Sequence, residues 1–222
     1  MKEPKIMIAV PCMDQVPAPF CQSMSMIQKV GECAVAYQMG SLIYTSRNDL
    51  AAKSVKIGAD YVLWLDSDMT FSPDILVRMY KTLTENDLDI VTGLYFRRVP
   101  PYSPVLFDKL EMTDEGCKWT DYKDKPLPNG LFEVGGCGFG CVLMSTQVFL
   151  DVQGKHHDMF GPVNRVGEDL SFCWRARDCG YKIVCDPSII CGHVGYAVID
   201  ERFYKEYNEV MLNDGVKDGD NK

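Results

Sequence analysis

Apolar runs alternate along the first half of the chain with segments whose apolar positions recur at helical spacing. The run "YVLWL" at 61–65 has no charged position, which is typical of a strand buried on both faces. Segment 46–58 offers Ser46 as a helix N-cap and Gly58 as a stop. Strands are predicted at 5–11, 61–65 and 89–96, and helices at 20–30, 46–58 and 73–83. This alternation predicts an α/β fold with a central, mostly parallel sheet flanked by helices.

The pattern changes after residue 96. Segment 97–130 is rich in Pro, Asp and Lys, and it predicts a long loop or a small irregular subdomain, of the kind that is usually functional. Segment 131–152 predicts a strand, a glycine-rich turn, a strand and a short helix. Further elements are predicted as helices at 168–180 and around Phe203, Tyr207, Val210 and Met211, and as a strand at 181–187. Residues 213–222 predict a flexible tail, so that 1–212 would form one domain.

The composition is that of an ordinary globular protein, with 46% apolar and 24% charged residues among 222. The net charge of −8 and the pI of about 4.9 argue against bulk binding of nucleic acid or anionic membrane, while leaving room for a local site for a small anion. No apolar run approaches the roughly 18 residues of a membrane span, and the N-terminus does not resemble a signal peptide. We therefore expect a cytoplasmic protein. Its ten cysteines include no C-x-x-C pair and are predicted to be reduced, and most lie in apolar stretches where they are expected to be packed, namely Cys137, Cys141, Cys173, Cys185 and Cys191.

Two acids, Asp66 and Asp68, follow the strand predicted at 61–65. Like charges this close repel each other, so a positive group is expected near them. Ligands of open α/β sheets bind beyond the carboxyl ends of the strands, and carboxylate oxygens there suit Mg²⁺ or Mn²⁺. The alternative interpretation makes Asp66 a solvated turn residue and Asp68 an acid that flanks a helix.

Two known ligand-binding motifs do not fit the chain. A calcium loop starting at Asp66 would need Gly and Glu where the chain has Phe71 and Val77. The glycines of "GGCGFGC" lack the spacing of a dinucleotide-binding turn. The stretch "LWLDSDMT" does resemble the D-x-D-x-T motif of the haloacid dehalogenase-like phosphatases, in which Asp66 would be the nucleophile and Asp68 the acid/base. That family usually opens its fold with the motif, whereas here a strand and helices precede it.

A second acidic pair opens the helix predicted at 168–180. The helix dipole favours acids at this position, and N-terminal capping alone would explain them. Capping does not explain the whole string, which contains Glu168-Asp169, then Arg175 or Arg177, Gly180, an apolar strand and His193. With this string the chain resembles the nucleotide-sugar glycosyltransferases of the glycosyltransferase-A fold, and among them the family 2-like group.

Three segments carry the resemblance, which covers most of 5–195. "AVP" at the end of the first strand, together with 46–69, resembles the nucleotide-binding half with its D-x-D. "GGCGFGCVLM" resembles the glycine-rich turn and strand beneath the acceptor site, and "GEDLSFCWRARDCGYKI" resembles the family's E-D, Arg and Gly-aromatic pattern. Segment 97–130 has no counterpart in the pattern and is expected to contribute to the acceptor site. A lone D-x-D is weak evidence, but the two motifs in this order are specific.

The resemblance implies a single Rossmann-like domain with a nucleotide-binding half at 5–96 and an acceptor-side half at 97–199. It implies a metal-dependent, hexosyltransferase-type enzyme that uses Mn²⁺ or Mg²⁺ and moves a sugar from a nucleoside-diphosphate sugar to a hydroxyl acceptor, with inversion favoured. Two alternatives stay open. One is the phosphatase with Asp66 as nucleophile, and the other is a non-catalytic protein that binds a nucleotide or a partner.

The resemblance also implies roles for single residues. Asp169 would be the general base, with Glu168 as the other member of the catalytic pair. The metal site would comprise Asp66, Asp68 and His193, with Asp66 orienting either the donor ribose or a metal-bound water. Arginines near a helix start or a strand end suit the base or phosphates of the donor. The residues expected at the donor are Pro11, Arg47, Asn48, Asp66, Ser67, Arg97, with Arg98 beside it, and Arg175.

Overall fold

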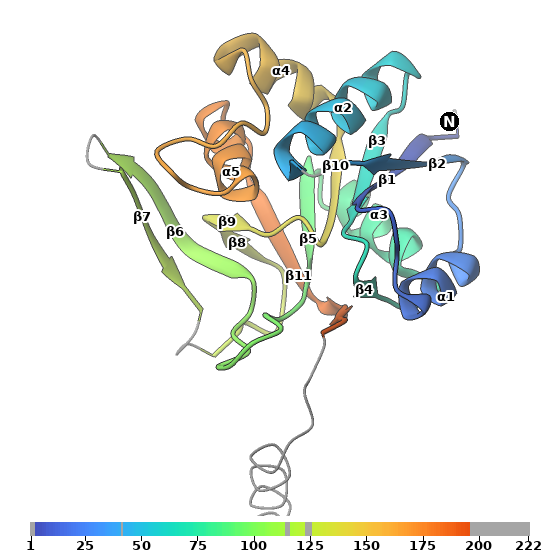
Figure 1. Cartoon of the computed structure of the whole chain (residues 1–222). Coiled ribbons are helices and arrows are strands. Elements are labelled where there is room, and N and C mark those ends of the chain that lie inside the picture. Colours follow the sequence, from blue (N-terminus) through green and yellow to red (C-terminus); the bar gives the residue numbers. More distant parts are fainter. Residues whose placement is uncertain (1–2, 41, 114–115, 123–125, 196–222) are drawn as a thin grey trace, which may run out of the picture.

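The computed structural model describes residues 3–40, 42–113, 116–122 and 126–195 (Figure 1). Within them, a seven-stranded sheet has the strand order β2-β1-β3-β10-β5-β11-β8. Its strands are β1 (Lys5–Cys12), β2 (Glu32–Met39), β3 (Tyr61–Leu65), β5 (Ile90–Leu94), β8 (Phe132–Val134), β10 (Cys141–Ser145) and β11 (Ile183–Ile190). β2, β1 and β3 are parallel, as are β5 and β11, while β10 is antiparallel to both β3 and β5. The predicted α/β fold with a mostly parallel sheet is confirmed.

Helices cover both faces of this sheet (Figure 1). One core lies beneath α2 (Ile43–Lys56), α4 (Thr146–His156) and α5 (Glu168–Asp178), and the other beneath α1 (Ala18–Met26) and α3 (Ile75–Glu85). Neighbouring side chains of a strand point to opposite faces. Accordingly, Val62 and Trp64 of β3 belong to the first core, whereas Leu63 and Leu65 belong to the second. The prediction of a strand buried on both faces is confirmed.

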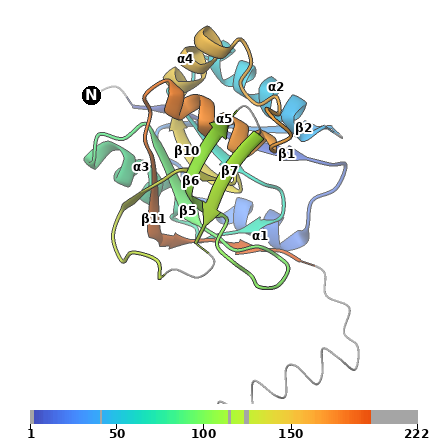
Figure 2. The same cartoon turned by 90° about the vertical axis from the view of Figure 1, so that its left-hand side faces the viewer.

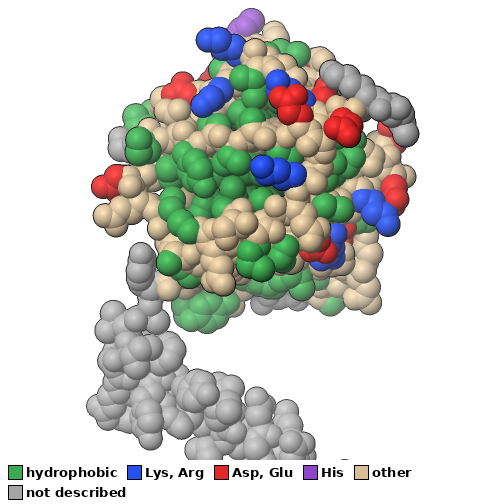
Figure 3. Space-filling model, turned by 90° about the vertical axis from the view of Figure 1, so that its right-hand side faces the viewer, with side chains coloured by type: hydrophobic (Ala, Val, Ile, Leu, Met, Phe, Trp, Pro, Cys, Tyr) green, Lys and Arg blue, Asp and Glu red, His purple; other side chains and the backbone are tan. Residues whose placement is uncertain are grey.

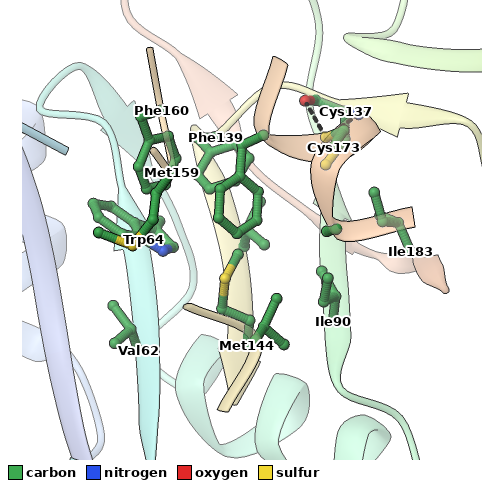
Figure 4. Packing of buried hydrophobic residues seen from close by; sticks show 14 of the residues in the cluster. Val62, Trp64, Ile90, Cys137, Phe139, Met144, Met159, Phe160, Cys173 and Ile183 are labelled. Atoms are coloured by element: carbon green, nitrogen blue, oxygen red, sulfur yellow. Dashed lines mark hydrogen bonds between the residues drawn. The ribbon is translucent and has the colours of Figure 1, made fainter. Parts of the chain in front are cut away.

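Aromatic rings fill the first core close to the ends of β3 and β10 (Figure 4). Phe160 stacks on Phe172 with a centroid distance of 4.5 Å. Trp64 meets Phe139 edge to face at 5.8 Å and Phe160 at 5.3 Å. Edge-to-face and offset contacts at such distances are the favourable arrangements for aromatic pairs. These rings form a rigid floor beneath the carboxyl edge of the sheet.

Segment 97–130, predicted as a loop or irregular subdomain, contains an antiparallel hairpin. β6 (Leu106–Thr113) pairs with β7 (Gly116–Asp121) and with β9 (Gly136–Cys137) in a three-stranded sheet. Figure 2, which faces this hairpin, shows it beside α5. A further short pair joins β4 (Met69–Thr70) to β12 (Gly192–His193). This pair brings the segment after β11 to the end of β3.

Several element boundaries differ from the prediction by a few residues, and two of the differences amount to about a turn of helix. Ser46 is not an N-cap, because α2 begins a turn earlier at Ile43 and Ser46 is buried inside it. The additional turn forms because Tyr44 packs against the first core. The first helix ends at Met26 instead of residue 30. The helix predicted around Phe203, Tyr207, Val210 and Met211 and the tail predicted at 213–222 lie outside the described residues.

The edge of the sheet at β2 carries apolar side chains. Val35, Tyr37 and Met39 alternate along β2 and are 43%, 47% and 69% exposed. Figure 3, which views the molecule from this side, shows hydrophobic side chains gathered on this face.

The ten cysteines are free thiols, and those predicted to be packed, Cys137, Cys141, Cys173, Cys185 and Cys191, are buried. Among the described helices, none has the length and apolar character needed to cross a membrane.

Leu63 provides a test of the core. Its side chain is fully buried in the central strand β3, so that Leu63→Ala removes buried methyl groups and leaves a cavity. We expect the free energy of unfolding to fall by about 2–5 kcal/mol, measured by urea denaturation. The control is Leu150→Ala on α4, where the side chain is 47% exposed and the expected change is below about 0.5 kcal/mol. Equal effects of the two substitutions would contradict the assigned position of β3.

Candidate functional site

An open cavity of about 340 Å³ lies at the carboxyl edge of the sheet, where β1, β3 and β5 end. This is where open α/β sheets bind their ligands. Most residues expected from the sequence line it: Pro11, Arg47, Asp66, Ser67, Asp68, Glu168, Asp169 and His193. Tyr95, Arg98 and Phe139 line it as well. The structure therefore brings the two acidic motifs into one cavity.

Arg47 connects the two motifs. From the second turn of α2 its Nη2 donates to Asp66 Oδ1 at 2.9 Å, and its Nε donates to Glu168 Oε1 at 3.2 Å. The guanidinium is only 3% exposed and lies 5.8 Å and 5.2 Å from the ring centroids of Trp64 and Phe139. Burial lowers the pKa of Arg47, but the charges of Asp66 and Glu168 outweigh this effect and raise the pKa overall. The positive group expected beside Asp66 is this permanently charged arginine.

One nitrogen of the Arg47 guanidinium remains without a hydrogen-bond partner in the described part of the chain. This nitrogen, Nη1, is buried. A buried donor without a partner is costly, and it normally indicates a water molecule or a ligand. Arg47 lines the cavity, so a water molecule or an anion bound there could supply the missing partner.

Asp68 has a different pair of partners. Its Oδ2 accepts a hydrogen bond from Arg98 Nη1 at 2.9 Å and lies 3.5 Å from His193 Nε2. Burial raises the pKa of Asp68, but the hydrogen bond with His193 and the charges of His193 and Arg98 bring it below the ordinary value. The hydrogen bond to Asp68 raises the pKa of His193 despite burial. The backbone holds the two residues together, since Val194 N donates to the Asp68 carbonyl at 2.8 Å.

The ring of His193 is oriented by a backbone carbonyl. Its Nδ1 lies 2.8 Å from Phe96 O, and only a protonated Nδ1 can donate to that oxygen. In the neutral imidazole this leaves the lone pair on Nε2, the nitrogen that faces Asp68. A carbonyl that fixes one ring nitrogen so that the other can bind a metal is a common arrangement in proteins.

Asp169 is the acid without a close cation. Its Oδ1 accepts a hydrogen bond from Leu170 N at 2.7 Å, and no ion pair joins it to a cation within the described residues. Burial, followed by the charge of Glu168, raises its pKa from 3.8 to about 6, against the opposing effects of Leu170 N and Arg47. Burial therefore outweighs the helix dipole, which was expected to favour the ionised form.

Tyr95 also lines the cavity, and reasoning from the sequence did not identify it. Its Oη accepts a hydrogen bond from Gly140 N at 3.2 Å, and its ring lies edge-on to His193 at 5.5 Å. A Cβ at Gly140 would lie 2.8 Å from Tyr95 Cζ, and a Cβ at Gly138 would overlap Tyr95 Oη. The glycine-rich turn makes room for this ring. The glycines of this turn were visible in the sequence as a sign of close packing, but the sequence did not show that Tyr95 is the residue packed against them.

Three residues expected at the donor do not line the cavity. Asn48 binds Asp158 Oδ1 and the backbone N–H of Phe160 at 3.3 Å and 3.1 Å. Arg175 donates to the carbonyls of Met159 and Gly161, each at 2.8 Å. Both side chains hold the segment that places Phe160 in the aromatic floor. Arg97 is exposed, and its neighbour Arg98 reaches into the cavity instead. Arg177, the alternative to Arg175, donates to Leu110 O at 3.3 Å.

The described residues contain no group of three or more His, Cys, Asp or Glu side chains that could hold a metal ion. Asp66, expected as a ligand, pairs with Arg47. Asp68 and His193 lie next to each other and fit a site to which the protein contributes two ligands. Mg²⁺ and similar cations usually complete such sites with water and substrate phosphate oxygens.

No protein-family model and no curated protein matches the chain. Solved structures match its fold. A197 from STIV has a TM-score of 0.62 and 16% identity over 88% of this chain and 87% of that chain. GalNAc-T7, crystallised with UDP, GalNAc and Mn²⁺, has a TM-score of 0.60 and 9% identity. The match covers 87% of this chain and 44% of the GalNAc-T7 chain, so this chain spans less than half of that protein. At these identities the similarity shows a glycosyltransferase-A-like fold.

The contact between Tyr95 and the glycine-rich turn can be tested with Gly138→Ala. The added Cβ would overlap Tyr95 Oη and displace the ring, so we expect a loss of about 1–3 kcal/mol in the free energy of unfolding. The loss should be smaller in a Tyr95→Phe background, because the overlapping oxygen is then absent. Urea denaturation of both single variants and the double variant measures this coupling. Gly154→Ala in α4, where a Cβ meets nothing within 4 Å, is the control. Equal losses in both backgrounds would show that Tyr95 does not require the glycine.

The raised pKa of Asp169 predicts how stability changes with pH. Between about pH 4 and pH 6 the folded protein retains a proton that the unfolded chain has released, so this residue lowers stability as pH rises. Asp169→Asn cannot ionise, and we expect it to gain stability relative to the wild type over this interval. Denaturation at several pH values measures the difference. In Asp178→Asn the trend should be reversed and should appear below about pH 4, because a hydrogen bond from Lys155 lowers the pKa of Asp178 in the folded protein. A pH-independent difference between Asp169→Asn and the wild type would contradict the assigned pKa.

Proposed function

We propose that the protein is a metal-dependent glycosyltransferase, similar to the family 2-like group, that moves a sugar from a nucleoside-diphosphate sugar to a hydroxyl acceptor with inversion. One observation carries the proposal. The two acidic motifs line a single cavity at the carboxyl edge of the sheet, and the pKa of one of their acids, Asp169, is raised to about 6. The similarity in fold to GalNAc-T7, whose structure contains UDP, GalNAc and Mn²⁺, supports a nucleotide sugar as donor.

Asp68 and His193 would hold the cation, Mn²⁺ or Mg²⁺. When bound, the cation would neutralise the charge that develops on the departing diphosphate. His193 suits this role because Phe96 O fixes its Nδ1 and leaves Nε2 toward Asp68. Neutral imidazole and carboxylate are the forms in which these side chains bind metals.

The donor would lie across the ends of β1 and β3. Pro11 and Ser67 line this part of the cavity, and Asp66 is held in place there by Arg47. We assign Asp66 to the ribose hydroxyls, since Arg47 already neutralises its charge. The unpartnered Nη1 of Arg47 would donate to an oxygen of the nucleotide.

Asp169 would act as the general base. A hydroxyl of the acceptor attacks the anomeric carbon while the bond from that carbon to the diphosphate oxygen breaks, and Asp169 accepts the hydroxyl proton. A base with a pKa near 6 is mostly ionised at neutral pH and still basic enough to assist. Glu168, held by Arg47 at 3.2 Å, would fix the helix start that carries Asp169 and keep its pKa raised.

The contacts of the two acids argue against a phosphatase. As a nucleophile Asp66 would have only Oδ2 for the attack, because its Oδ1 pairs with the buried Arg47. An acid/base Asp68 would need a pKa near neutrality, whereas its pKa is lowered. For Asp68 the phosphatase thus requires the opposite of what the surroundings of this residue favour.

The proposed base can be tested with Asp169→Asn, which keeps the size of the side chain but cannot accept the proton. We expect transfer to fall by about 10²–10⁴-fold, while Mn²⁺-dependent binding of the nucleoside diphosphate is unchanged. The assay follows release of nucleoside diphosphate from a panel of nucleotide sugars with Mn²⁺ and hydroxyl acceptors. Asp178→Asn, at the other end of α5, removes the same charge and should leave the rate unaltered.

Three other outcomes would each exclude part of the proposal. Transfer that survives in Asp169→Asn would leave Asp169 as a helix cap and favour a retaining mechanism or another base. Binding of a nucleotide sugar without turnover would support a protein that only binds nucleotides. Hydrolysis of simple phosphate monoesters, lost in Asp66→Asn, would support the phosphatase.

A further inference from the structure

The Asp68 oxygen that a cation would bind is already occupied by an arginine of the chain. Arg98 Nη1 lies 2.9 Å from Asp68 Oδ2, and His193 Nε2 lies 3.5 Å from the same oxygen. A divalent cation between Asp68 and His193 would place its two charges within a few ångströms of the guanidinium. Like charges this close repel strongly. Arg98 and a cation therefore compete for Asp68 unless an anion joins them.

The Arg98 side chain can move away from Asp68 without rearrangement of the loop that carries it. The Arg98 side chain is 46% exposed, and exposed ion pairs of this kind contribute little to stability. The backbone around it is held by hydrogen bonds from Arg97 N to Ser103 O and from Tyr102 N to Val99 O, at 3.0 Å and 2.9 Å. Rotation of the side chain alone would therefore release Asp68.

A diphosphate in the cavity would provide a new partner for the released side chain. The planar guanidinium binds phosphate oxygens through two parallel hydrogen bonds, which a lysine cannot reproduce. Arg98 lines the same cavity as Asp68 and Ser67, so its side chain need not cross to another site.

We propose that Arg98 is an exchangeable counter-ion, which neutralises Asp68 when no cation is bound and moves to the diphosphate of the donor when a cation takes Asp68. The proposal rests on the proposed function, because it requires a cation and a diphosphate in this cavity. It assigns Arg98 a positioning role that couples the two ligands: Arg98 would leave Asp68 when a cation is bound and would pair with the diphosphate when the donor is bound.

The proposal predicts that Arg98→Gln has opposite effects on the two ligands. Mn²⁺ alone should bind up to about 5-fold more tightly, because a competitor for Asp68 is removed. UDP at saturating Mn²⁺ should bind about 10-fold more weakly, because a charged hydrogen-bond donor to the diphosphate is lost. Isothermal titration calorimetry measures both affinities. Arg98→Lys, which keeps the charge without the planar fork, should change the Mn²⁺ affinity less than the UDP affinity. Lys56→Gln, an exposed change of the same charge at the end of α2, should change neither affinity.

The outcomes separate this proposal from the proposed function. If the wild type binds Mn²⁺ and UDP and transfers sugar, but Arg98→Gln shifts both affinities in one direction or neither, only the role of Arg98 is overturned. Opposite shifts without any transfer would support the exchange and leave the transferase unsupported. If the wild type binds neither Mn²⁺ nor any of UDP, GDP, ADP, CDP and dTDP, both proposals are wrong.

Discussion

The buried guanidinium of Arg47 connects three parts of the fold that are distant in sequence. It extends from α2, pairs with Asp66 at the end of β3, and pairs with Glu168 at the start of α5. A charge buried to this degree is tolerable only when it is paired, and removing one partner of such a pair typically costs about 3–5 kcal/mol. The aromatic faces of Trp64 and Phe139 contribute to the same environment, because they exclude water and attract the cation. The two acidic motifs lie in one cavity because each supplies an acid to the same arginine.

The different surroundings of the four acids give them different chemical properties. Asp66 and Glu168 each form an ion pair with Arg47. Asp68 pairs with Arg98 and His193. Asp169 has no ion pair within the described part of the chain, and its pKa is the one that rises to about 6. Neighbouring acids whose pKa values are pushed apart commonly divide the roles of acid, base and ligand between them. The arrangement thus leaves one carboxylate, that of Asp169, suited to proton transfer.

The sequence predicted the parts of this structure that depend on local pattern. The apolar run at 61–65 predicted a buried strand, and the acids after it predicted a site at the sheet edge. The sequence could not predict contacts that depend on distant segments. The position of Tyr95 depends on glycines in the turn before β10, Arg98 reaches the cavity instead of Arg97, and Arg175 and Asn48 contact the segment around Phe160 instead of lining the cavity. The strand β2 was missed because its alternating apolar side chains are partly exposed at an edge, and the hairpin of β6 and β7 because polar residues conceal its pattern.

We propose that this cavity binds a nucleoside diphosphate together with a divalent cation. Calorimetric titration of the wild-type protein with UDP, GDP, ADP, CDP and dTDP, each with Mn²⁺ and with a chelator, tests it most directly. We predict that at least one of these nucleotides binds with Mn²⁺, that its affinity falls at least about 10-fold in the chelator, and that Asp68→Asn abolishes the difference. Binding of none of them, or binding that is equally tight without a cation, would contradict the account.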